Sequence, residues 1–261
     1  RCFQRVLGVD LYADEFFRFL GAEEIVSVDA SDYEGATLVH DLNRPFPEHL
    51  RERFDLVVDG GTLEHVFDYP SALRQCLELV AVGGHFITIT PANQWMGHGF
   101  YQFSPELFFR VFHAQNGFSL RKIVLFEYEK MDADFYEVKD PAVIGRRVQL
   151  RSSRPTLLAV LAKRVGRAVL FSVPPQQSDY ADARWHQSRK AASEESTGSP
   201  TLFQRLRTAM NPYWPFWLRY WKNRLLDFRK EGLASLSNRG QFRRLGRKEV
   251  AQERQEPRAA R

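Results

Sequence analysis

One glutamate and two histidines follow strand-like segments, in positions where functional residues are often found. Glu64 and His65 come directly after the strand-like segment 54–61, which ends in two glycines. His98 lies between two glycines in the segment 91–106, which follows the next strand-like segment. Imidazole titrates near neutral pH, so His65 and His98 are candidate general bases. The alternative for the first pair is that it opens the following helix, with the acid near the positive end of the helix dipole.

The segment 91–106 as a whole is rich in aromatic and hydrogen-bonding side chains. Such a loop after a strand is typical of a binding pocket, so we expect it to contact a substrate. Asn93 and Gln94 are the candidate substrate-binding residues here, together with Glu64. Tyr101 is a third catalytic candidate, because its hydroxyl can help to orient or deprotonate a substrate hydroxyl. The alternative is a surface loop whose rings pack on the helix that follows.

These residues need elements that bring them to one edge of a sheet. Short apolar runs, which predict strands, alternate with amphipathic stretches, which predict helices. The alternation is typical of a parallel sheet covered on both faces, where ligands bind outside the carboxyl ends of the strands. The expected strands are 23–31, 36–42, 54–61, 85–93, 118–128 and 156–165, and the expected helices are 62–80 and 104–117.

The ends of the two helices carry local signals. The segment 81–84, "AVGG", supplies the glycine that is expected after the end of the first helix. The second helix has Ser104 as its expected N-cap, Pro105 as its first residue and Gly117 as its stop.

In this order the segments resemble the class I S-adenosylmethionine (SAM) dependent methyltransferases. The resemblance rests on two strands that end in Asp29 and Asp41, on "FDLVVDGGTLEHV" (54–66), and on "LVAVGGHFITITP" (79–91). Val82 stands where the family usually has proline, and "LEHV" is common in its small-molecule branch. The resemblance covers about residues 5–165. It implies an α/β fold with a doubly wound, mostly parallel seven-stranded sheet of the Rossmann-like kind.

The resemblance also implies the cofactor, SAM, and methyl transfer to oxygen or nitrogen of a small or carbohydrate-like acceptor. Asp29 would accept hydrogen bonds from the ribose hydroxyls. Asp41 would accept one from the adenine amino group, and the backbone N–H of Leu42 would donate to a ring nitrogen. The methionine part would lie at the end of the next strand, beside the cofactor-binding residues Asp59, Gly60 and Gly61.

The first glycine-rich loop departs from the family pattern. The candidate segment 5–17 offers Gly8 alone, with Asp10 and Tyr12 where further glycines are expected. Either the first strand lies upstream of Arg1, or the loop is degenerate and binds SAM weakly or not at all. The rival function is a non-catalytic binding or scaffold module whose glycine loop has decayed. A nicotinamide-dependent oxidoreductase is disfavoured, because its G-x-G-x-x-G loop is equally absent.

The composition of the chain further limits which kind of protein it can be. The chain has 261 residues and 44% hydrophobic residues, which is typical of a globular protein. Its two cysteines, Cys2 and Cys76, cannot form a disulfide framework, and no spacing of His, Cys and Asp predicts a metal site. The apolar run 156–173 is interrupted by basic residues, so a membrane span is not expected. The expected location is a reducing compartment, the cytoplasm.

The C-terminal third differs from the rest. We expect a methyltransferase-like domain at 1–171, a polar linker at 172–200, a basic aromatic helical segment at 201–231 and a disordered basic tail at 232–261. Residues 201–261 hold 15 Lys/Arg and 5 Asp/Glu, a net charge of +10, whereas the whole chain has +5. Tryptophans among basic residues in 201–230 suit peripheral contact with a membrane, packing against the core or a second subunit, or, less well, nucleic acid.

Overall fold

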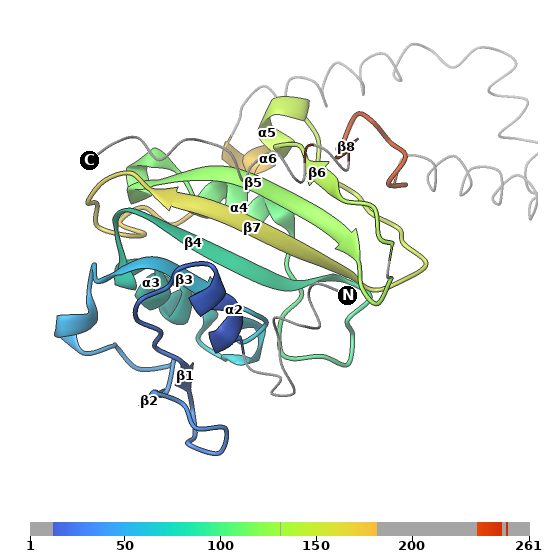
Figure 1. Cartoon of the computed structure of the whole chain (residues 1–261). Coiled ribbons are helices and arrows are strands. Elements are labelled where there is room, and N and C mark those ends of the chain that lie inside the picture. The colour runs from blue at the N-terminus through green and yellow to red at the C-terminus, as the bar shows by residue number, and fades with distance from the viewer. Residues whose placement is uncertain (1–12, 131, 182–233, 247–248, 250–261) are drawn as a thin grey trace, which may run out of the picture.

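The computed structural model of the protein describes residues 13–130, 132–181, 234–246 and 249. Within these residues a six-stranded sheet has helices on one face, and a small two-stranded sheet lies beyond its β3 edge (Figure 1). Several sequence predictions lie outside the described residues. They are the loop around Gly8, most of the linker, and the basic aromatic segment 201–230.

The six-stranded sheet has the order β3-β4-β7-β5-β6-β8. Strands β3 and β4 are parallel, and the other four pairings are antiparallel. Because β7 runs against both β4 and β5, strands β3, β4 and β5 point the same way. The strands are β3 (Phe54–Asp59), β4 (Val80–Asn93), β5 (Phe118–Glu127), β6 (Tyr136–Val138), β7 (Thr156–Arg164) and β8 (Phe242–Arg244).

This sheet corrects the predicted one, since among the described residues it has six strands with one parallel pairing instead of seven mostly parallel strands. The individual strands at 54–61, 85–93, 118–128 and 156–165 are confirmed. The periodicity of the sequence did not predict the position of β7, which lies between β4 and β5 and pairs with both in the antiparallel direction. A strand that returns antiparallel needs no crossover helix, and the described part of the connection from β5 to β7 holds the short strand β6 and the four-residue helix α5 (Pro141–Ile144).

The first two predicted strands are shorter than expected. Strands β1 (Val28–Asp29) and β2 (Leu38–Val39) form a parallel pair with Asp29 opposite Val39. They belong to their own sheet, because no described strand lies between β1 and β3 to join them to the larger one. A hydrogen bond from the N–H of Asp68 to Oδ1 of Asn43, at 3.2 Å, ties the end of β2 to the segment after β3.

The helices begin and end at residues that capping explains. Helix α3 (Tyr69–Leu79) starts later than the predicted 62, because Asp68 is its N-cap and accepts from Ser71 N. Helix α4 (Pro105–Val111) has Ser104 as N-cap, as predicted, but it ends before Gly117. The remaining helices are α2 (Asp14–Phe19), α6 (Ser178–Ala181) and the 3-10 helices η1 (Glu48–Leu50), η2 (Leu63–His65) and η3 (Ala114–Asn116).

The glycines of "AVGG" do not stop a helix, which corrects the sequence interpretation. Helix α3 runs directly into β4, and the partner of β3 shifts from Val80 opposite Phe54 to His85 opposite Leu56. A Cβ on Gly84 would lie 2.8 Å from the backbone oxygen of Asp55. Glycine is therefore required here because β3 and β4 approach closely at an irregular part of the ladder.

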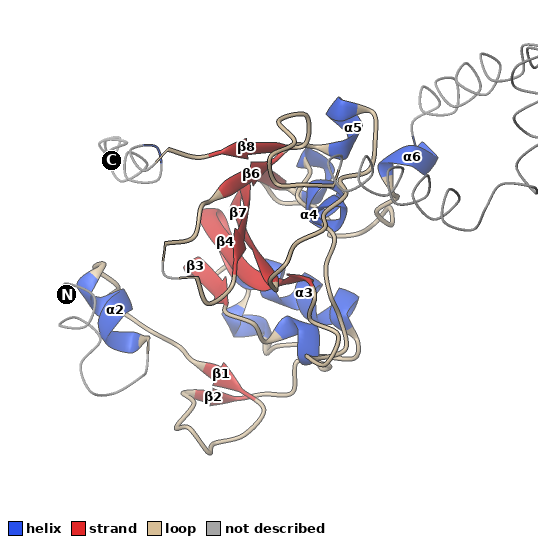
Figure 2. Cartoon of the chain, turned by 90° about the vertical axis from the view of Figure 1, so that its right-hand side faces the viewer, coloured by secondary structure: helices blue, strands red, loops and turns tan. Residues whose placement is uncertain are grey.

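The core lies between one face of the sheet and helices α3 and α4, which cover that face (Figure 2). Alternate residues of β7 are buried, as a strand covered on one side requires. Fully buried side chains such as Leu77, Phe86 and Phe108 each contribute roughly 1.5–3 kcal/mol through burial. Helix α2 lies on the opposite side of the sheet from α3 and α4 (Figures 1 and 2).

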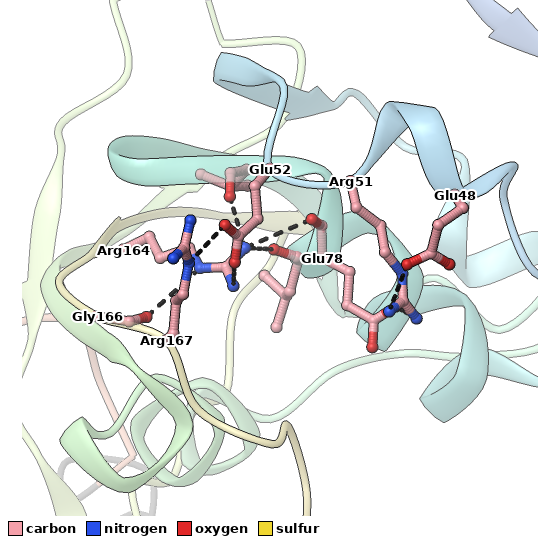
Figure 3. Close-up of polar contacts among 9 residues, drawn as sticks. Glu48, Arg51, Glu52, Glu78, Arg164, Gly166 and Arg167 are labelled. Atoms are coloured by element: carbon pink, nitrogen blue, oxygen red, sulfur yellow. Dashed lines mark hydrogen bonds and ion pairs between the residues drawn. The ribbon is translucent and has the colours of Figure 1, made fainter.

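A buried arginine joins β7 to the end of α3 (Figure 3). Arg164 donates from Nη1 to the carbonyl of Val80 at 2.6 Å, and its Nη2 lies 2.8 Å from Oε1 of Glu52. Arg167 contacts the other oxygen of Glu52 at 2.7 Å. The positive charge lies at the negative end of the α3 dipole, where it is favourable.

Part of the predicted disordered tail belongs to the fold. Strand β8 pairs with β6, and Phe242 is buried in the core cluster. Arg243 and Arg244 form ion pairs with Glu137 and Asp134. Disorder is thus the wrong expectation for residues 242–244, whose one large apolar side chain is surrounded by arginines in the sequence.

Candidate functional site

The end of β3 is shaped by Asp59. Its Oδ1 accepts hydrogen bonds from the N–H groups of Thr62 at 3.0 Å and Leu63 at 3.3 Å. Its Oδ2 accepts from Oγ1 of Thr88 on β4 at 2.7 Å. These three contacts within the protein hold the turn into η2 against the neighbouring strand. Asp59 therefore positions the residues that follow it.

The two glycines after Asp59 differ in what surrounds them. Gly61 has a φ of 100°, and a Cβ there would lie 3.3 Å from Oε1 of Glu64. Gly60 faces open space, since a Cβ there would meet nothing within 4 Å. Gly61 thus leaves room for the Glu64 side chain, and Gly60 leaves the edge of the sheet accessible.

Glu64 is a buried acid at this turn. Only 1% of its surface is exposed, and burial raises the pKa of its carboxyl group, with a further rise from the nearby charge of Asp59. Its Oε1 lies 3.4 Å from Nε2 of His98. Its Oε2 is buried and has no hydrogen-bond partner among the described residues.

The loop after β4 is fastened to η2 through the backbone of Glu64. The carbonyl of Glu64 accepts from the N–H groups of Phe100 at 2.9 Å and Tyr101 at 3.3 Å. Gly99 has a φ of 66°, and a Cβ there would lie 2.9 Å from the same carbonyl oxygen. This close approach needs glycine and brings His98 onto η2.

Three predicted site residues therefore meet. The rings of His65 and His98 have centroids 4.8 Å apart at an angle of 70°. One ligand atom from each of Glu64, His65 and His98 lies within 4.8 Å of the others, and both histidines are exposed. We call these residues the Glu64–His65–His98 cluster. The sequence predicted each member and their common edge of the sheet, but not that Glu64 and His98 are in contact.

Other predicted site residues point elsewhere. The hydroxyl of Tyr101 donates to the carbonyl of Phe67 at 2.7 Å, and its catalytic role stays a prediction. Asn93 donates to Oγ of Ser152 at 3.1 Å, and Gln94 donates to the carbonyl of Ser152. Both amides hold the end of β4 against the segment before β7 instead of facing the cluster.

Trp95 is a residue that the selection of site residues missed. Its ring centroid lies 5.0 Å from that of His98 and 4.9 Å from that of Tyr128. Its Nε1 donates to the carbonyl of Thr156 at 2.8 Å, which fixes the ring. Trp95 forms an apolar wall beside the cluster. The aromatic content of 91–106 was the available signal.

The nucleoside-binding candidates lie at the small sheet. Asp29, at the end of β1, lines an open cavity of about 460 Å³ that also contacts Asp14 of α2. Oδ1 of Asp29 accepts from the N–H of Ser31 at 2.8 Å. Asp41 is exposed, and hydrogen bonds from the backbone and side chain of Asn43 lower the pKa of its carboxyl group.

Leu42, the next residue, is half-buried and packs against the core cluster. Its carbonyl accepts from Nε2 of Gln75 on α3 at 3.5 Å. Together with the contact between Asp68 and Asn43, this places the carboxyl end of β2 beside the start of α3. The ends of β2 and β3 therefore share one edge of the molecule.

The similarity of the chain to known proteins is weak. No protein-family model matches the chain, and no curated protein is similar to it. Among solved structures, the chain is similar to a phosphoethanolamine N-methyltransferase 1 of Haemonchus contortus, in complex with phosphoethanolamine and S-adenosylhomocysteine. The TM-score is 0.26 at 9% identity, over 68% of this chain and 40% of that one. A similarity this low defines neither the fold nor the activity of this chain.

Among the described helices none has the length and apolar character needed to cross a membrane.

Proposed function

We propose that the protein is a SAM-dependent methyltransferase that transfers a methyl group to an oxygen or nitrogen of a small acceptor. The observation that carries the proposal is the common edge at which parallel strands end in acidic residues beside a histidine cluster. Asp29 and Asp41 follow the paired strands β1 and β2, and the Glu64–His65–His98 cluster follows β3. Ligands of open α/β sheets bind at such an edge.

The nucleoside side of this edge fits the cofactor. Asp29 lines the cavity beside α2, where its carboxylate would accept from ribose hydroxyls. Asp41 is an exposed carboxylate whose pKa is lowered by hydrogen bonds from Asn43, and it would be an acceptor for an amino group. Gly60 faces open space where the methionine part would pass. When bound, SAM supplies a methyl group that its positive sulfur has already activated.

The histidine cluster suits the acceptor side. In an in-line displacement the protein mainly orients the reactants and removes a proton from the acceptor. The exposed imidazoles of His65 and His98 are in reach of an acceptor that lies over the edge. Glu64 contacts Nε2 of His98 and would stabilise the imidazolium that forms when the ring takes the proton. Trp95 supplies an apolar wall against which the acceptor can pack.

The experiment is calorimetric titration of SAM into the full-length protein and two variants. Asp29→Ala removes the carboxylate that would accept hydrogen bonds from the ribose hydroxyls. Asp32→Ala is the matched control, because it removes a nearby exposed acid. We expect micromolar binding to the wild type and the control, and its loss in Asp29→Ala. Absence of binding at millimolar SAM would contradict the proposal and favour a non-catalytic module.

Peripheral membrane contact through residues 201–230 is a separate proposal, which rests on their basic and aromatic composition. Deleting residues 201–261 would be a poor test, because it removes β8 and the buried Phe242. Replacing the Lys and Arg residues of 201–230 by Gln keeps the chain length. The proposal predicts that binding to anionic vesicles falls in this variant, and equal binding would contradict it.

A further inference from the structure

The geometry points to a further site: we infer that the Glu64–His65–His98 cluster binds a divalent transition-metal ion, with zinc as the reference case. The sequence does not predict such a site, because the first two residues are separated from His98 by helix α3 and strand β4. The inference rests on the positions of three ligand atoms, on the buried carboxylate and on the rigidity of the two turns that hold them.

The ligand atoms are arranged at nearly the required spacing. Zinc binds histidine nitrogens and carboxylate oxygens at about 2.0–2.2 Å, so ligand atoms of a tetrahedral site are roughly 3.4 Å apart. Oε1 of Glu64 and Nε2 of His98 are already 3.4 Å apart. The ligand atom of His65 lies within 4.8 Å of both. His65 is exposed, so a small rotation of its ring can complete the set.

The buried carboxylate is the second, independent observation. Glu64 is 99% removed from solvent, and its Oε2 has no hydrogen-bond partner in the described part of the chain. The ion pair that the structure shows for Glu64 is with His98, which carries charge only when it is protonated. Burying an acid without a fixed partner is costly, and a bound cation offsets this cost when the acid is ionised.

The surrounding backbone holds these side chains in place. Gly61 and Gly99 both have positive φ values; Gly99 approaches the Glu64 carbonyl too closely for a Cβ, and a Cβ on Gly61 would be in tight contact with Oε1 of Glu64. Asp59 fixes the turn before η2 through three hydrogen bonds. Metal sites depend on such supporting contacts, which keep the ligands oriented before the ion arrives.

The donor set indicates the class of ion. Two imidazoles and one carboxylate suit zinc, cobalt or iron, whereas magnesium and calcium prefer oxygen ligands. Three protein ligands leave one position open, as in catalytic zinc sites. Both histidines face solvent, so this position is accessible. If the proposed function holds, the metal would replace the imidazoles as the activating group, because rings that bind the metal no longer accept the proton. The metal lowers the pKa of a bound acceptor hydroxyl, whose proton then leaves to solvent. This consequence rests on the methyltransferase proposal, but the site does not.

The test uses full-length, tag-free protein that has been stripped of metal with a chelator. ZnCl₂ is titrated by calorimetry, and CoCl₂ is followed by its visible absorption, which is stronger in tetrahedral than in octahedral coordination. The ligand variants are Glu64→Gln, His65→Gln and His98→Gln. The chain also offers a matched control, His49→Gln, since Glu48 and His49 are adjacent in the 3-10 helix η1 but belong to no group of three possible metal ligands among the described residues.

We expect one zinc ion per chain, a tetrahedral cobalt spectrum, and affinity that falls at least tenfold in each ligand variant but not in His49→Gln. His65 and His98 are exposed, so their substitution leaves the fold intact, which circular dichroism checks. No stoichiometric zinc binding, or equal binding in His98→Gln and His49→Gln, would overturn the inference. A SAM titration of the same samples separates the two proposals. SAM binding without zinc binding overturns the metal site alone, and zinc binding without SAM binding overturns the methyltransferase alone.

Discussion

Oε1 of Glu64 lies 3.4 Å from Nε2 of His98, although a helix and a strand separate the two residues in the sequence. The contact exists because the carbonyl of Glu64 also accepts hydrogen bonds from the loop that carries His98. A buried acid and an exposed base are thereby held together at the end of β3. Two predictions test how this edge is built and charged, and a third tests the buried ion pair of β7 in another part of the fold.

The first prediction concerns the pH dependence of stability. Burial raises the pKa of Glu64 above its usual 4.5 in the folded protein, so the native state binds this proton more tightly than the unfolded state. The contribution of Glu64 to stability is therefore fully present below the unfolded pKa and is lost as the pH rises through the folded pKa. Glu64→Gln, which cannot ionise, should gain stability relative to the wild type as the pH rises from about 4 to 7.

Urea unfolding of both metal-free proteins at several pH values measures this difference. Glu48→Gln is the control, because it removes the same charge at an exposed position beside Arg51. A difference between Glu64→Gln and the wild type that does not vary with pH would show that Glu64 is not desolvated in the folded state.

The second prediction concerns Gly99. An alanine there would have a positive φ and a Cβ 2.9 Å from the Glu64 carbonyl oxygen, so the loop must move away from η2. We expect Gly99→Ala to lower the free energy of unfolding by about 1–3 kcal/mol. Gly97→Ala is the matched control in the same loop, since its Cβ would meet nothing within 4 Å. Equal stability of the two variants in urea unfolding would contradict the described loop.

The third prediction concerns the buried arginine of β7. Arg164→Met leaves Glu52 without its buried partner and the carbonyl of Val80 without its donor. We expect the free energy of unfolding to fall by about 3 kcal/mol. Arg167 also contacts Glu52, but its own side chain is 79% exposed. Arg167→Met should therefore lower the free energy of unfolding by less than about 1 kcal/mol. The reverse order of the two losses in urea unfolding would show that the ion pair is misassigned.

The sequence predicts those parts of this fold that depend on local pattern. Strands β3, β4, β5 and β7 are apolar runs of the right length, and Ser104 caps α4 as expected. The position of β7 depends on pairing between segments that are distant in sequence, which periodicity does not report. The short β1 and β2 lie apart from the larger sheet, so apolar content alone overestimates their length.

For the candidate site, too, residue types could be predicted from the sequence but long-range contacts could not. Glu64, His65 and His98 are recognisable from residue type and from their position after a strand. Their convergence depends on a backbone contact at Gly99 that residue type does not reveal. Residue type alone also does not reveal that the hydroxyl of Tyr101 donates its hydrogen bond to the carbonyl of Phe67.

The measurement that tests the central claim most directly is photochemical labelling of the full-length protein with SAM that carries an isotope in its methyl group, followed by peptide mapping. If the cofactor lies along the shared edge, the label should appear in peptides that contain residues 28–42 or 59–65, and excess unlabelled S-adenosylhomocysteine should remove it. Two results would contradict a SAM site at this edge: a label that S-adenosylhomocysteine does not reduce, or a label that maps only to other segments.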